Sequence, residues 1–231
     1  MSGSTERVRK LTRVLINRQR GTLAEDMGID VGSNDPKNLF CLLIGSLLLS
    51  ARIGHELAMR SARILFQRGW TTPQKMAKTT WEQRVKALDE GGYVRYDERT
   101  STMLGETAQM VIDKYAGDLR KLREAARVGD GRPDPARERK LLKEFKGIGD
   151  VGANIFFREA QLVWPELYPF ADDRILQTAK QVGLPPQPGK LAELVHRKRD
   201  FVRLVDSLIT VRMNHAERQI QAAAPAALAA R

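Results

Sequence analysis

Apolar side chains recur every three or four residues along most of the chain, the period expected of α-helices with one buried face. The residues that share such a face are Val8, Leu11 and Leu15, then Leu104, Ala108 and Val111, and later Leu204, Leu208 and Val211. Alternating, strand-like stretches are scarce, and prolines and glycines stand between the periodic segments. The pattern therefore predicts an all-α protein made of short helices.

One break in this pattern is unusually rich in glycine. The stretch "FKGIGDVGANIFF", residues 145–157, places three glycines between a charged helical segment and an apolar one. An N-cap aspartate and a following proline at 134 and 135 predict a helix that runs up to Gly147. A second helix is expected from Ala153 to Trp164. The sequence thus predicts two helices joined by a tight glycine hairpin.

The hairpin is either a structural corner or a place where bare backbone approaches a ligand. Gly147 and Gly149 allow a positive φ and carry no side chain that would hold a ligand away. Gly152 falls in the first turn of the next helix, where backbone N–H groups have no intrahelical acceptor. These donors and the helix dipole favour a phosphate, to which Lys146 adds a positive charge and Asp150 an opposing negative one.

Composition narrows the class of partner. The chain has 231 residues, 42% of them hydrophobic, which suits one large domain or two small lobes. A net charge of +11 and a pI near 10 favour polyanionic partners. The longest apolar run, residues 39–51, is shorter than the about 20 residues of a membrane span. The beginning of the sequence lacks the apolar stretch of a signal peptide, so we expect a cytoplasmic protein.

The single cysteine, Cys41, lies within that apolar run. One cysteine cannot form an intrachain disulfide or supply the four thiolates of an iron–sulfur cluster. We expect it to be a small buried hydrophobic residue.

Four segments taken in order resemble a known family. They are "NLFCLLIGSLLLSARIGHELAMRSARILF" (38–66), "LDEGGYVRYDERTSTMLGETAQMV" (88–111), the glycine hairpin, and "DDRILQTAKQVGL" (172–184), in which an aspartate opens a helix. Together they resemble the helix-hairpin-helix (HhH-GPD) DNA glycosylase superfamily, in particular its endonuclease III-like group. The resemblance covers about residues 38–184.

This resemblance implies an all-α fold with two helical lobes and a cleft between them. A six-helix barrel that carries the hairpin would span residues 33–163. The second lobe would combine residues 1–32 with 164–231 and carry the catalytic aspartate. Its low-complexity end, residues 221–231, is expected to fray.

The implied activity is that of a monofunctional DNA N-glycosylase of base excision repair. Such an enzyme flips a damaged or mismatched base out of the duplex and hydrolyses its N-glycosidic bond. Asp172 matches the catalytic position when the following apolar helix is aligned without gaps, and Asp173 is the alternative, with the other aspartate capping the helix. Bifunctional members have a lysine where this chain has Val151, so strand cleavage through a Schiff base is not expected.

The resemblance also implies the residues that contact DNA. In the hairpin these are Lys146, Gly147, Ile148, Gly149, Val151 and Gly152. Arg52 stands where the family fills the space left by the flipped base. Tyr93 and Arg95 belong to a loop, with Val94 and Tyr96, whose tip would enter the duplex with an aromatic side chain; the alternative is that one of the two tyrosines packs in the core.

The expected partner is double-stranded DNA that contains a base lesion, bound by a monomer. No resident metal or iron–sulfur cluster is expected, although the resemblance allows a monovalent cation held by hairpin carbonyls. Two alternatives remain open: a DNA-binding protein that kept the scaffold without catalysis, and an unrelated all-α interaction protein. Which base is removed does not follow from the sequence.

Overall fold

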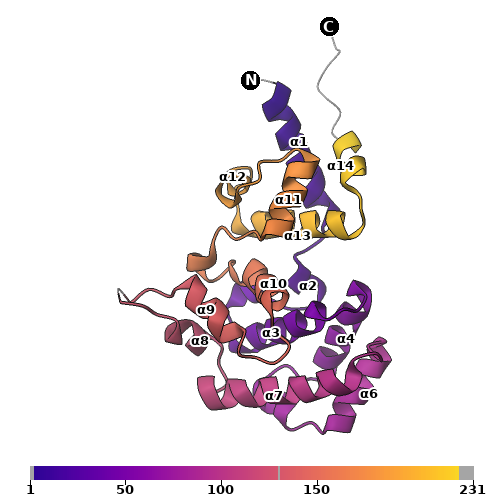
Figure 1. The fold of residues 1–231 in the computed structure, drawn as a ribbon, viewed down its shortest axis with the longest axis vertical. Helices are drawn as coiled ribbons and strands as arrows, with labels where there is room; N and C mark the ends of the chain where they lie inside the picture. The colour runs from indigo at the N-terminus through magenta and orange to yellow at the C-terminus, as the bar shows by residue number, and fades with distance from the viewer. Residues whose placement is uncertain (1–2, 130, 224–231) are drawn as a thin grey trace. The chain divides into compact units, whose positions relative to one another are not determined.

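A computed structural model describes residues 3–129 and 131–223 of the chain (Figure 1). Within these residues the secondary structure is helical, and the only β-type pairing is an isolated bridge between Arg127 and Pro133. The all-α prediction is therefore confirmed. No helix among the described residues is both long and apolar enough to cross a membrane. The expected frayed end falls partly on α14, which runs to Ala223, and its remainder lies outside the described residues.

The chain forms two compact units. Unit 1 contains the residues up to Leu23 and those from Tyr168 onward, and unit 2 contains Ala24–Leu167. The expected division fell at residues 33 and 163. The segment from 24 onward belongs with unit 2 because the backbone N–H of Ala24 donates to the buried carboxylate of Glu159, at 3.1 Å.

Unit 2 is a bundle around one apolar helix. Its helices are α2 (Leu23–Asp26, beginning one residue before the division), η1 (Val31–Ser33), α3 (Pro36–Ser50), α4 (His55–Gln67), α5 (Pro73–Ala77), α6 (Trp81–Gly91), α7 (Asp97–Tyr115), α8 (Arg120–Ala125), α9 (Pro135–Leu142), α10 (Asp150–Ala160) and η2 (Pro165–Leu167). Helix α3 is buried from Leu39 to Leu48 and packs against α4 and α10. Cys41 lies in this core, as predicted, and its burial raises the pKa of the thiol to about 12.

Unit 1 packs five helices around a second core. They are α1 (Gly3–Arg18), α11 (Asp173–Val182), α12 (Pro188–Ala192), α13 (Lys198–Met213) and α14 (Glu217–Ala223). Helix α13 contacts α1, α11 and α12, and α14 contacts α1 and α11. The core includes Leu11 and Leu15 of α1, Ile175 of α11 and Leu204 and Leu208 of α13, all fully buried. The helical faces read from the sequence are therefore the faces that meet in this unit.

The two helices of the hairpin are shorter than predicted. Helix α9 begins at Pro135, and Asp134 caps it by accepting a 2.8 Å hydrogen bond from Ala136 N–H, as expected. It ends at Leu142, however, and not at Gly147. A hydrogen bond from Phe145 N–H to Leu142 O then tightens the chain, which carries the Phe145 ring into the core beside Tyr115. Helix α10 begins at residue 150 and ends at residue 160, where a similar tight turn replaces the predicted continuation to residue 164.

Two carboxyl groups lie close together at α9: Glu138 on the helix itself and the partly buried Glu166 of η2. Glu138 is fully buried, and burial together with the neighbouring carboxyl group of Glu166 raises its pKa to about 9. Burial acts to raise the pKa of Glu166 as well, but two hydrogen bonds and the charge of Arg123 hold it below its usual range. At neutral pH Glu138 therefore keeps its proton, while Glu166 is ionised and paired with Arg123.

Candidate functional site

The corner of the glycine hairpin lies at the surface of unit 2. Lys146, Gly147 and Gly149 are exposed, whereas the side chain of Ile148 between them is buried. Ile148 anchors the turn, because its N–H donates to Phe145 O and its side chain packs under α10. The main chain on either side of Ile148 is thus held in place and still reachable by a ligand.

Two of the three hairpin glycines have a reason inside the protein. Gly147 has φ +87°, and a Cβ there would lie 2.8 Å from Met103 Sδ. A Cβ on Gly152 would lie 3.1 Å from Ile148 Cδ1 and 3.5 Å from the carbonyl oxygen of Ser46 on α3. Backbone conformation explains the first glycine, and close packing of α10 on α3 explains the second.

Gly149 differs from both. Its φ of −98° is open to any residue, and a Cβ built on it would meet no other atom within 4 Å. It is the N-cap residue of α10 and makes no capping bond through a side chain. Glycine is a favourable N-cap residue, and serine, asparagine or aspartate would stabilise the helix by only a few tenths of a kcal/mol more. Nothing within the fold therefore requires a bare backbone at this position.

The start of α10 consequently has no capping side chain, and its N-cap and first helical residue, Gly149 and Asp150, are exposed. The first N–H groups of a helix have no intrahelical acceptor, and they carry the positive end of the helix dipole. At α10 no side chain of the N-cap residue accepts from them. The arrangement fits an anion that approaches along the exposed corner.

Two hydrogen bonds join the hairpin and the 92–96 turn to the C-terminal end of α3. The hydroxyl of Ser50, the last residue of α3, donates to Gly147 O at 2.9 Å. The hydroxyl of Tyr93 donates to Leu48 O, also at 2.9 Å. The exposed Arg52 follows α3 directly. The hairpin, Arg52 and the 92–96 turn therefore lie around one end of a single buried helix.

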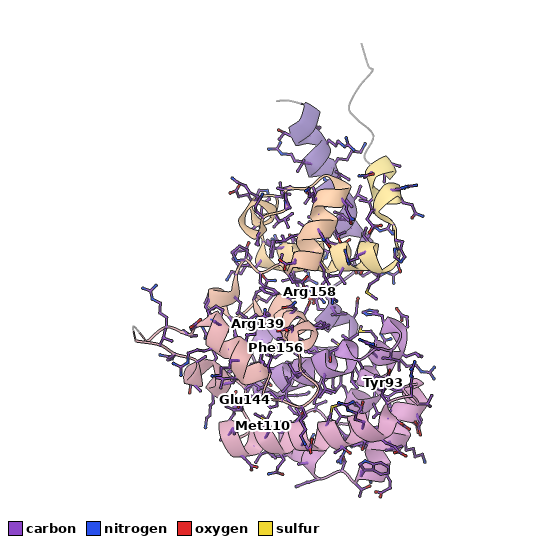
Figure 2. All side chains as sticks on the ribbon, viewed as in Figure 1. Tyr93, Met110, Arg139, Glu144, Phe156 and Arg158 are labelled. Atoms are coloured by element: carbon purple, nitrogen blue, oxygen red, sulfur yellow. The ribbon has the colours of Figure 1, made fainter. Side chains whose placement is uncertain are left out.

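The structure corrects the expected role of Tyr93. Its side chain is fully buried, and burial raises the pKa of its hydroxyl to about 12 (Figure 2). A ring fixed in the core cannot wedge between stacked bases. Its neighbour Val94 has an exposed fraction of 63%, the largest of the exposed large hydrophobic residues in the described chain. Arg95 is also exposed, and its guanidinium lies 5.4 Å from the centre of the Tyr96 ring.

The hairpin lysines are paired with carboxylates. Lys146 Nζ lies 2.7 Å from Glu106 Oε1 on α7. Lys143 Nζ lies 2.7 Å from Asp150 Oδ1, and this hydrogen bond lowers the pKa of Asp150. The expected positive charge of Lys146 is present, but it has a counterion within the protein. Val151, where a nucleophilic lysine would be needed for strand cleavage, is half-buried at the start of α10.

In unit 1, Asp172 is the N-cap of α11. Its Oδ1 accepts hydrogen bonds from the N–H groups of Arg174 at 2.9 Å and Ile175 at 3.2 Å. Asp173 is the first helical residue and is exposed. The sequence favours Asp172 as the catalytic residue and predicts that Asp173 caps the helix. The structure shows the reverse for the cap, because Asp172 itself is the N-cap. The cap bonds engage Oδ1 and leave Oδ2 for other partners.

No site for a metal ion built from three or more His, Cys, Asp or Glu side chains occurs in residues 3–129 and 131–223. Two hairpin carbonyls already accept hydrogen bonds, Phe145 O from Ile148 N–H and Gly147 O from Ser50 Oγ. A carbonyl oxygen has a second lone pair, so a monovalent cation at the hairpin stays a prediction.

Comparison with known proteins does not identify a family for this chain. None of the protein-family models matches the chain, and neither the search of curated proteins nor that of solved structures finds a match. The resemblance to the helix-hairpin-helix glycosylases therefore rests on the sequence motifs.

Sequence reasoning missed three features of the site: the Ser50 bond to the hairpin, the two lysine–carboxylate pairs, and Val94 as the exposed tip of its loop. Glu106 and Lys146 are far apart in sequence, so no local pattern links them. For the Ser50 bond the sequence offered one indication: a hydroxyl-bearing residue ends the apolar run of α3.

Proposed function

We propose that this chain is a monofunctional DNA N-glycosylase of the helix-hairpin-helix superfamily, which removes a damaged or mismatched base from double-stranded DNA. The two-lobed arrangement of that superfamily, with the hairpin on one lobe and Asp172 on the other, belongs to this proposal. The net charge of +11 agrees with a polyanionic partner.

The observation that carries the proposal is the exposed Gly149. Neither its φ nor its surroundings require a glycine, and it begins a helix whose first N–H groups are open. A ligand that approaches the backbone closely would require it. A DNA phosphate fits, since it accepts hydrogen bonds from main-chain N–H groups and is stabilised by the helix dipole.

The surrounding side chains supply the other functions that base removal needs. Val94 is an exposed apolar side chain able to enter a base step, and the exposed Arg52 would occupy the space of an extruded base. Extruding a base costs a few kcal/mol, and the cost is lowest for a damaged or mispaired base.

Asp172 would act on the sugar. As the N-glycosidic bond breaks, the deoxyribose gains positive charge, and a carboxylate about 4 Å away stabilises it by about 4 kcal/mol at an effective dielectric constant of about 20. The cap bonds from Arg174 and Ile175 fix the orientation of the carboxylate. Its Oδ2 is left to orient or deprotonate the attacking water.

The product would be an intact strand with an abasic site. Val151 has no amine with which to attack the sugar, so no Schiff base forms at this position. Strand breaks should then appear only after alkali is added.

A panel of duplexes tests the proposal. Each duplex carries one alkylated, deaminated or oxidised base, and products are compared with and without alkali. We expect base release from at least one duplex, with breaks in the alkali-treated samples only. Breaks without alkali would contradict the monofunctional assignment, and no release from any duplex would favour the second candidate.

That second candidate is a non-catalytic DNA-binding protein on the same scaffold. The capping role of Asp172 favours it, because an N-cap aspartate has a sufficient structural reason to be present. The exposed hairpin serves either function.

A further inference from the structure

The two lysines nearest the hairpin corner are both paired with carboxylates. The exposed fractions of the paired side chains are 41% for Lys143 and 70% for Asp150, and 69% for Lys146 and 41% for Glu106. All four are therefore accessible to a large ligand. Two cations and two anions cancel at this corner, although the whole chain carries a charge of +11.

The carboxylates lie where a DNA phosphate would otherwise find its counterions. Asp150 is the first residue of α10, at the open helix start, and its hydrogen bond from Lys143 lowers its pKa, so it is ionised at neutral pH. Glu106 projects from α7 to Lys146, the residue directly before Gly147. A phosphate that reached the hairpin would have to displace one or both carboxylates.

We propose that Asp150 and Glu106 compete with DNA phosphates for Lys143 and Lys146, and so weaken the binding of undamaged DNA at the hairpin. This inference rests on the proposed binding of DNA at the hairpin. It adds that the two carboxylates determine how strongly DNA binds there. Exposed ion pairs are weak and screened by salt, so phosphates can open them. The displaced carboxylates then repel the phosphate that replaced them.

Glu106 has a further reason to retain its lysine. Its second oxygen, Oε2, is buried and has no hydrogen-bond donor among the described residues. If Lys146 moved to a phosphate, this partly buried charge would lose its counterion, which is unfavourable. Competition at Lys146 should therefore be at least as strong as at Lys143.

For a glycosylase, such competition would help the protein to move along DNA in search of a lesion, because undamaged DNA is not held tightly. Contacts to phosphates carry no sequence information and supply nearly all non-specific affinity. A hairpin that holds undamaged duplex weakly releases it quickly, and the additional contacts of an extruded base decide where the protein stays.

The test measures binding of a plain, undamaged duplex by fluorescence anisotropy at several salt concentrations. The proteins are the parent, Asp150→Asn, Glu106→Gln, the double variant, and Glu193→Gln as control. Glu193 forms a similarly exposed ion pair with Lys190 in unit 1, so its variant makes the same change in net charge on the unit that does not carry the hairpin.

Each hairpin variant should bind about threefold more tightly than the parent at low salt, as expected for removing one charge about 6 Å from a phosphate in water. The plot of log K against log[salt] should steepen by up to about 0.9 for each lysine released. The double variant should show both effects, and the control should match the parent. Because Glu106 is on α7 and Asp150 on α10, agreement between the two variants excludes a local disturbance of either helix.

Two results separate the failure of this inference from failure of the proposed function. If the parent binds duplex with a steep salt dependence and the hairpin variants match Glu193→Gln, the carboxylates do not compete and this inference is wrong. If the parent shows a flat salt dependence, phosphate binding itself is absent and both are wrong.

Discussion

The starts of α10 and α11 are chemically opposite. At α10 the N-cap residue is a glycine, and no side chain of that residue accepts from the first N–H groups. At α11 the N-cap is Asp172, whose Oδ1 accepts from Arg174 and Ile175. The N–H groups at the start of α10 donate to no capping side chain, and the Asp150 carboxylate there is paired with Lys143, whereas α11 holds a carboxylate fixed on its own N–H groups.

The difference suits the two charges involved in base removal. A phosphate is negative before, during and after the reaction, so an open helix start can bind it throughout. The sugar becomes positive only as the base leaves, so a fixed carboxylate stabilises it only then. In the proposed function, the same local element, a helix N-terminus, would serve binding in one unit and catalysis in the other.

The largest expected effect follows from removing the charge at the start of α11. Asparagine caps helices about as well as aspartate, so Asp172→Asn should leave the thermal midpoint unchanged while base release falls about 10²–10³-fold. Asp172→Ala should lose the activity and also about 1 kcal/mol of stability. The matched variant Asp173→Asn should retain activity. The rate of base release is measured on the duplex from which the parent removes a base. A larger loss in Asp173→Asn than in Asp172→Asn would assign the catalytic role to Asp173.

The next effect comes from adding a methyl group at the start of α10. Gly149→Ala should cost about 0.5–1 kcal/mol of stability, because alanine caps a helix less well than glycine although a Cβ there contacts nothing, and should weaken duplex binding about tenfold by blocking the backbone. Gly147→Ala is the opposite case: its positive φ should cost about 1–3 kcal/mol of stability. Unfolding and binding curves for both variants provide the check. Unchanged binding by Gly149→Ala would remove the main support for the hairpin site.

A smaller effect is expected at the 92–96 turn. Val94→Ser should leave stability nearly unchanged and lower base release about tenfold, since an exposed apolar wedge would be lost. Tyr93→Phe should do the reverse, costing about 1 kcal/mol because Leu48 O loses its donor, with activity retained. Melting curves and base-release rates distinguish the two. Equal activity losses would indicate that the turn acts through its fold alone.

The last prediction concerns how stability depends on pH. It tests whether Glu138, a buried residue of α9, stabilises the fold independently of the candidate site. Glu138 has its pKa raised from 4.5 to about 9 in the folded state, so its contribution to stability is complete below about pH 4.5 and is lost as the pH rises towards 9. Glu138→Gln should therefore melt higher than the parent at pH 8.5, by about 2–4 °C for each kcal/mol of the penalty that it removes, and show less decline between pH 6 and 8.5. Identical pH profiles would show that Glu138 is ionised when folded.

Much of the fold follows from local pattern. The apolar faces that include Leu11, Leu104 and Leu204 are the faces buried in the structure, and Asp134 caps α9 as its residue type and the following proline predict. These features depend on spacings of a few residues, which a sequence displays directly. The ends of α9 and α10 do not, because tight turns that bury Phe145 and Trp164 decide where each helix stops.

The site was less predictable because distant contacts decide it. Tyr93 rather than Val94 turns inward since its hydroxyl reaches Leu48 O on α3. Lys146 is neutralised by Glu106, which the sequence places on another helix. Of two adjacent aspartates, either could cap α11 by residue type, and only the backbone geometry gives that role to Asp172.

The central claim is that the first N–H groups of α10 bind a DNA phosphate. Following backbone amide signals by NMR while plain duplex is added to the ¹⁵N-labelled protein tests it most directly. The account predicts that the amides of Gly149, Asp150 and Val151 shift among the most and saturate together, and that the shifts are lost in Gly149→Ala. Duplex binding with these amides unmoved would contradict it.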